Sequence, residues 1–202
     1  MSKEIFDKYV NELKTKQKFN SKSKKWEFVN PWAAKKTADW FEYCWNKIVA
    51  SGLQFDGKHI TLNENGVSYD YVAYKNKMLL AYPESKIDDG LVYKGDTFSF
   101  EKENGVVSYH HKLANPFDHK EEDIIGGYCV IKNKRGEFIT TLSRDEISKA
   151  RRVAKTQTIW QSWFAEMCKK TIIKKAVKFH FDDVYSEMEE EDNKNYDLDK
   201  AL

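Results

Sequence analysis

Three short loops that end in glycine constrain the fold of this chain most strongly. Each lies between two runs in which apolar and polar residues alternate: 63–66 between 59–62 and 67–72, 101–105 between 97–100 and 106–110, and 132–136 between 128–131 and 138–142. A short loop with Asn-Gly or another glycine between such runs is the sequence signal of a β-hairpin. The middle of the chain is therefore predicted to form antiparallel hairpins that build a central sheet.

Helical patterns flank these hairpins on both sides. Apolar spacing predicts helices over residues 2–15 and 32–50, and the Lys/Ser/Asn-rich residues 16–25 between them are predicted to be a mobile loop. After the hairpins, Ser143-Arg-Asp-Glu146 matches a capping box. It is predicted to begin a helix to about residue 156, with a second long helix over 159–179. The predicted fold class is α+β, with antiparallel hairpins followed by two C-terminal helices and a helical N-terminal region.

Charge is distributed very unevenly along the 202 residues, although the net charge is only +2. Residues 1–36 contain 10 lysines and 4 acids, residues 144–180 contain 10 basic residues and 3 acids, and residues 181–202 contain 2 basic residues and 9 acids. Such asymmetry is typical of chains with a charged partner, often nucleic acid, although solvated helix faces give the same pattern.

Several classes of protein are disfavoured. No apolar run approaches the roughly 20 residues of a membrane helix, and the first residues lack the apolar region of a secretion signal. Three widely spaced cysteines fit a reducing compartment. No glycine-rich phosphate loop is present, and the histidines over 110–119 with Cys129 match no common zinc spacing, so no metal or cofactor is expected.

The predicted helix over 159–179 carries the most informative pattern. On a helical wheel, Lys170, Lys174 and Lys178 lie on the same face as the aromatic residues that precede them, which are Trp160, Trp163 and Phe164. Lysines that converge in this way can neutralise phosphates, and neighbouring aromatic rings can stack bases. For the three aromatic residues we favour a place in the core, and for the lysines we favour phosphate contact. Arg151, Arg152 and Lys155 add cations nearby in the sequence.

The same segment resembles the signature of the RecT family of phage single-strand annealing proteins. The resemblance rests on Trp160 followed by Met167-Cys-Lys-Lys-Thr-Ile-Ile-Lys-Lys-Ala-Val-Lys-Phe179. Weaker similarities, in the family's order, are Ala73-Tyr-Lys-Asn-Lys-Met-Leu-Leu-Ala81, Tyr93-Lys-Gly-Asp-Thr-Phe-Ser-Phe-Glu101 and Ile125-Gly-Gly-Tyr-Cys-Val-Ile-Lys132. Together they cover roughly residues 52–181.

The resemblance implies ATP-independent binding and annealing of single-stranded DNA in phage-type homologous recombination, without catalysis. It further implies self-assembly into a ring or helical filament, a 5′→3′ exonuclease and a host single-strand binding protein as partners, and a place in the bacterial cytoplasm as a phage or prophage product. The DNA contacts that the sequence and the resemblance together predict are Lys75, Arg151, Arg152, Lys155, Trp160, Lys169, Lys170, Lys174, Lys175 and Lys178.

The resemblance also suggests how the chain is organised. Residues 1–51 are predicted to be a basic helical region for oligomerisation or DNA contact, residues 52–181 the annealing core, and residues 182–202 an acidic tail that is disordered at its end. That tail could compete with DNA for the basic helix or meet the basic face of another subunit.

Two other functions remain open from the residues alone. Asp96, Glu101 and Asp118 in the strand-rich region could hold Mg²⁺ in a nuclease. Alternatively, the basic helices could dock an acidic protein, which would make the chain a non-catalytic interaction module.

Overall fold

The computed structural model describes residues 3–117, 119–154 and 157–189. The chain divides into two compact units, residues 1–73 and 74–202. Helices and antiparallel strand pairs occur in both units, which confirms the α+β class.

The first unit combines two helices with two separate hairpins. Its elements are α1 (Lys3–Thr15), β1 (Gln17–Asn20), β2 (Lys25–Phe28), the 3-10 turn η1 (Ala33–Lys35), α2 (Ala38–Ala50), β3 (Ile60–Asn63) and β4 (Gly66–Tyr69). Helix α3 (Tyr71–Ala81) spans the boundary between the units.

An aromatic cluster holds the first unit together. The ring centroid of Phe6 on α1 lies 5.2 Å from that of Trp45 on α2 and 5.2 Å from that of Phe55, and Phe6 is almost fully buried. The Tyr9 ring packs edge-on against Phe55, and its hydroxyl accepts a hydrogen bond from the backbone N–H of Leu62 at 3.2 Å. The N-terminal helix therefore packs against both α2 and the β3–β4 hairpin.

Three expectations for the first unit were wrong in detail. The segment 16–25 is part of the β1–β2 hairpin and not a mobile loop. Helix α2 begins at Ala38, because the Thr37 hydroxyl caps it by accepting from the backbone N–H of Trp40. The strand expected over 67–72 ends at Tyr69, since the Asp70 carboxylate accepts from the backbone N–H groups of the first turn of α3.

A three-stranded antiparallel sheet forms the centre of the second unit. Its strands are β5 (Lys86–Tyr93), β8 (Ile124–Asn133) and β9 (Gly136–Ser143), in the order β5-β8-β9. The hairpin β8–β9 was expected, but β5 was not, because Asp88 and Asp89 interrupt its apolar pattern. The predicted hairpin over 97–110 is a separate two-stranded sheet, β6 (Thr97–Glu103) with β7 (Val106–Lys112).

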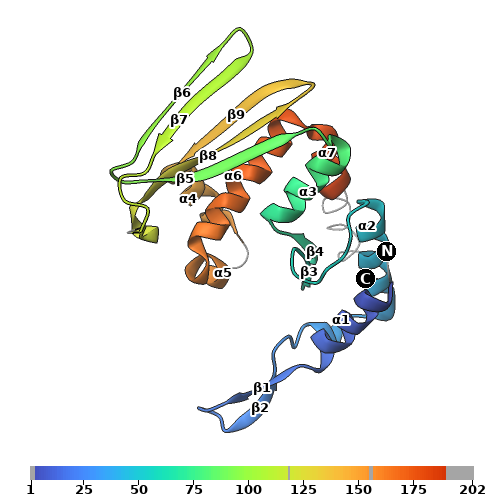
Figure 1. The fold of residues 1–202 in the computed structure, drawn as a ribbon. Coiled ribbons are helices and arrows are strands. Elements are labelled where there is room, and N and C mark those ends of the chain that lie inside the picture. The colour runs from blue at the N-terminus through green and yellow to red at the C-terminus, as the bar shows by residue number, and fades with distance from the viewer. Residues whose placement is uncertain (1–2, 118, 155–156, 190–202) are drawn as a thin grey trace. The chain divides into compact units, whose positions relative to one another are not determined.

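The central sheet is covered on both faces (Figure 1). On one face, Tyr128 and Val130 of β8 pack with Val107 of the β6–β7 hairpin. On the other, α6 approaches so closely that a Cβ atom at Gly127 would lie 2.5 Å from Cδ1 of Ile172. The Gly126-Gly127 pair thus permits close packing of the helix and the neighbouring strands on β8.

Four helices follow the sheet within the described part of the chain. They are α4 (Arg144–Val153), α5 (Gln157–Ser162), α6 (Phe164–His180) and α7 (Asp182–Glu189). The capping box at Ser143 is confirmed, since its hydroxyl accepts from the N–H of Glu146 and its N–H donates to the Glu146 carboxylate. The helix expected over 159–179 is instead broken at Trp163, whose backbone leaves the helical region.

The acidic tail is partly helical. Its first residues form α7, whose Val184 and Met188 are buried, whereas residues 190–202 lie outside the part of the chain that the structure describes. Within the described residues, no helix has the length and apolar content needed to cross a bilayer.

Candidate nucleic-acid interface

Helix α6 has one buried side and one basic side. Its buried residues are Phe164, Cys168, Ile172, Ile173, Ala176 and Val177. Lys170, Lys174 and Lys178 lie outside this set; the first two are half-buried and Lys178 is exposed. Successive lysines are four residues apart, which is about 6 Å along the helix axis. We call these three residues the lysine ladder.

Two tyrosine rings contact the ammonium groups of two of the three ladder lysines. The Nζ atoms of Lys174 and Lys178 lie 5.6 Å and 5.3 Å from the ring centroid of Tyr185 on α7. The Lys174 Nζ atom also lies 5.9 Å from the ring of Tyr74, which is buried. Cation–π contacts of this kind contribute about 0.5–1 kcal/mol at exposed sites, and an uncharged ring does not cancel the positive charge. The rings therefore orient two of the three ladder lysines, Lys174 and Lys178.

Two acidic residues of α7 are paired with groups on other elements. The Asp183 carboxylate accepts from the Tyr82 hydroxyl at 2.6 Å and from Arg135 at 3.2 Å, and Glu187 pairs with the buried Lys77. Burial raises the pKa of Asp183, but the hydrogen bond from Tyr82 and the charge of Arg135 outweigh it and lower the pKa. These two carboxylates thus bind groups that lie off α6.

Two further predicted lysines of α6 lie beside carboxylates. Lys175 lies 3.2 Å from Glu146 on α4, and Lys169 lies 3.5 Å from Glu166 one turn earlier. A backbone hydrogen bond from Ser143 and the Lys175 ammonium lower the pKa of Glu146, so it is ionised at neutral pH. A phosphate at Lys169 or Lys175 would therefore have to compete with a carboxylate. The sequence positions of these two lysines do not reveal that competition.

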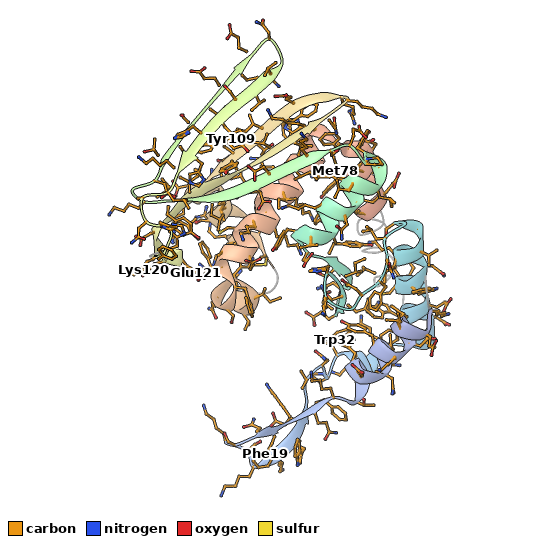
Figure 2. The ribbon with its side chains drawn as sticks, in the orientation of Figure 1. Phe19, Trp32, Met78, Tyr109, Lys120 and Glu121 are labelled. Atoms are coloured by element: carbon orange, nitrogen blue, oxygen red, sulfur yellow. The ribbon has the colours of Figure 1, made fainter. Side chains whose placement is uncertain are left out.

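The arginines of α4 divide into packed and exposed residues. The guanidinium of Arg151 lies 5.6 Å from the ring centroid of Phe164, which brings the end of α4 against the start of α6. Arg152 is exposed, and Lys155 lies outside the described residues. Arg144, which the sequence did not single out, donates to the backbone carbonyls of Glu121, Glu122 and Ile124 (Figure 2 labels Glu121) and so ties α4 to the start of β8.

Lys75 forms an internal ion pair. Its ammonium contacts the Asp89 carboxylate of β5, and their side chains are only 26% and 11% exposed. A phosphate at Lys75 would have to compete with this partner. The structure therefore places Lys75 in the packing between α3 and β5.

The aromatic residues before α6 have different environments. Trp160 is only 3% exposed and packs against Phe164 with ring centroids 6.0 Å apart, so neither face of its indole is open to a base. We therefore withdraw Trp160 from the predicted DNA contacts. Trp163, which we favoured as a core residue, is instead 63% exposed, because the helix breaks at this residue. Wheel geometry on an unbroken helix could not separate these two tryptophans.

The acidic residues considered for a nuclease do not converge where the structure describes them. The Asp96 side chain is buried, and its carboxylate accepts from the backbone N–H groups of Tyr93 and Ala114 and lies 3.2 Å from Nε2 of His111. Glu101 is exposed on β6, and Asp118 lies outside the described residues. Among residues 3–117, 119–154 and 157–189, no three His, Cys, Asp or Glu side chains are grouped as a metal site.

Cys129 and Cys168 are unsuited to nucleophilic attack. Cys168 on α6 and Cys129 on β8 are buried, and burial raises the pKa of each thiol to about 12. Both thiols are therefore protonated at neutral pH, whereas nucleophilic attack requires the thiolate. Cys168 packs as a small apolar residue on the buried side of α6.

Comparison with known proteins identifies a family. Residues 71–200 match the RecT family, and this range contains α3, the central sheet, the β6–β7 hairpin and the lysine ladder. It begins later than the resemblance from the sequence motifs indicated and extends through most of the acidic tail. No curated protein and no solved structure matches the chain significantly. Because the match covers well over half of the residues, the chain belongs to the RecT family, which supports single-stranded DNA binding and a general role in recombination by strand annealing.

Proposed function

We propose that the lysine ladder of α6 binds the phosphate backbone of single-stranded DNA while the bases stay free to pair with a complementary strand. The observation that carries this proposal is the ladder itself: three lysines at i, i+4 and i+8 on the side of α6 away from its buried residues, within the family-matched segment.

The physical requirement of annealing fits this arrangement. Two polyanionic strands must approach each other, so their phosphates have to be neutralised, and the base edges have to remain exposed. Lysine ammonium groups release counterions from phosphates and carry no base-specific hydrogen-bonding pattern. Two ladder ammonium groups lie against tyrosine rings and are thereby oriented, which reduces the conformational entropy that DNA binding would cost.

Family membership also motivates the proposed context. We propose that the chain works without ATP or catalysis, as a ring or helical filament, beside a 5′→3′ exonuclease and a host single-strand binding protein, in the cytoplasm of a bacterium that carries the phage or prophage. The exposed Arg152 is a further candidate phosphate contact at the end of α4.

Strand annealing with purified protein tests the role of the ladder. The double variant Lys170→Glu, Lys174→Glu is expected to keep its circular dichroism spectrum and to lose annealing of two complementary labelled oligonucleotides. The control is Lys94→Glu, Lys112→Glu, which makes the same change in net charge at two exposed residues off α6. Near-normal annealing by the ladder variant, or equal loss in both variants, would contradict the proposal.

A further inference from the structure

The β1–β2 hairpin of the first unit presents an aromatic face that its own unit does not cover. In the antiparallel register, Phe19 pairs with Trp26 and Gln17 pairs with Phe28, so these four side chains share one face. Phe19, Trp26 and Phe28 are 53%, 67% and 47% exposed. Large exposed aromatic residues grouped in this way mark an interaction site more often than a bare surface.

Local contacts fix the shape of this hairpin. The Asn20 carboxamide oxygen accepts from the backbone N–H groups of Lys22 and Ser23 in the turn. The rings of Phe19 and Trp26 pack edge-on with centroids 5.7 Å apart. The aromatic face is therefore held in one geometry before any ligand arrives (Figure 2 labels Phe19 on this hairpin).

The hairpin is strongly basic, which favours a polyanionic ligand. Residues 16–28 contain five exposed lysines and one acid, Glu27. The Glu27 carboxylate accepts from the Asn20 carboxamide and the Ser23 hydroxyl, and these hydrogen bonds lower its pKa, so its charge is engaged inside the hairpin. Cores of protein–protein interfaces are depleted in lysine, whereas single-strand binding surfaces combine lysines with exposed aromatic rings.

The same composition continues along the chain after β2. Pro31, Trp32, Lys35 and Lys36 line a shallow hollow in this unit, together with Glu64 and Asn65 of the β3–β4 turn (Figure 2 labels Trp32). The Lys36 ammonium lies 4.8 Å from the ring centroid of Trp40, against which Trp32 packs edge-on. Lysines and aromatic rings thus alternate over residues 16–40, outside the family-matched segment 71–200.

We propose that the β1–β2 hairpin is a second contact for single-stranded DNA, in which Trp26 stacks on an unpaired base and the hairpin lysines bind the flanking phosphates. This contact rests on the proposed function only in taking the same ligand. Base faces are hidden in a duplex, so the hairpin holds a strand before it pairs and loses its hold once it has paired. It thereby gives the protein a preference for unpaired over annealed DNA that a ladder of lysines cannot supply.

The experiment compares two labelled oligonucleotides of equal length by fluorescence anisotropy: one ordinary single strand and one abasic strand that keeps the phosphates. Trp26→Ala in the full chain is expected to weaken binding of the ordinary strand by roughly five- to 150-fold, the range for loss of one base–aromatic stack. It is expected to leave binding of the abasic strand unchanged. Trp26→Phe should restore most of the affinity, and Phe117→Ala, at a 96% exposed ring in the second unit, is the matched control.

A second variant separates the charge from the ring. Lys24→Gln with Lys25→Gln is expected to weaken both strands and to reduce the salt dependence of binding. The proposal is overturned if Trp26→Ala binds the ordinary strand like the parent, weakens both strands equally, or changes only the oligomeric mass. Loss of binding by the ladder variants together with unchanged binding by both hairpin variants would refute the hairpin contact alone. A parent chain that binds neither strand would refute the proposed function as well.

Discussion

The salt dependence of DNA binding gives the sharpest test of the lysine ladder. Neutralising Lys174 and Lys178 with Lys174→Gln, Lys178→Gln removes two proposed phosphate contacts. The matched control, Lys169→Gln with Lys175→Gln, removes the same charge from the same helix. Lys169 and Lys175 lie beside Glu166 and Glu146, and Lys174 and Lys178 lie against the Tyr185 ring.

The expected magnitude follows from counterion release. Each phosphate contact to a single strand contributes about −0.7 to the slope of log K against log salt concentration. Loss of two contacts should therefore make the slope shallower by about 1.4. Between about 50 and 200 mM salt, the parent should then lose roughly sevenfold more affinity than the ladder variant.

Fluorescence anisotropy of a labelled oligonucleotide at four or five salt concentrations measures this slope. The control pair should shift the slope by clearly less than the ladder pair. Urea unfolding of both variants checks the fold, since loss of the contacts with Tyr185 should cost no more than about 1 kcal/mol per lysine. Equal shifts in the two pairs would show that net charge, and not position on α6, controls binding, and this would refute the ladder as a distinct phosphate site.

Three further predictions concern stability and can be checked by urea unfolding. Gly127→Ala should destabilise the chain by about 1–3 kcal/mol, because the new methyl group overlaps Ile172, and an unchanged midpoint would contradict the packing described for α6. Asp96→Asn should cost about 2–3 kcal/mol at pH 7 by disturbing buried charge-assisted hydrogen bonds. Burial alone would raise the pKa of Asp96, but its backbone and side-chain hydrogen bonds outweigh burial and lower the pKa. Its contribution should therefore be fully present above about pH 4 and shrink as pH falls below that value through the lowered pKa; a deficit that does not begin to shrink below about pH 4 would argue against this. The hydrogen bond to Asp70 raises the pKa of His59, so the stability lost in His59→Gln should be largest below about pH 6.5 and fade as pH rises through the raised pKa. Because both side chains are partly exposed, this loss of stability should stay below about 1 kcal/mol. A loss that grows toward about pH 9 would contradict the pairing.

Much of the fold could be predicted because its signals are local. The hairpin loops ending at Gly66, Gly105 and Gly136 each join two adjacent paired strands, and the Ser143 capping box begins α4. Turn chemistry and helix caps act within a few residues, so a single sequence contains them. The β1–β2 hairpin was missed because its turn contains no glycine: Lys24 takes the positive φ of 51° that glycine usually supplies.

The candidate site could be predicted less completely, because charge partners come from distant parts of the chain. Lys75 and Lys175 match basic positions of the RecT family, yet in the structure they pair with Asp89 and Glu146 on other elements. An unbroken wheel puts Trp160 and Trp163 on the same face, but the helix breaks at Trp163, so that Trp163 is exposed while Trp160 is buried.

By itself, the sequence determined the class, the hairpins, the uneven charge and the basic helix with its family signature, because each depends on neighbouring residues or on their order. Only the tertiary structure decided which of the predicted cations lie beside carboxylates, which lie against rings, and which ring faces stay open. Packing of α6 on the sheet and of α7 on α6 makes that choice, since burial and ion pairing are set by residues up to about a hundred positions apart.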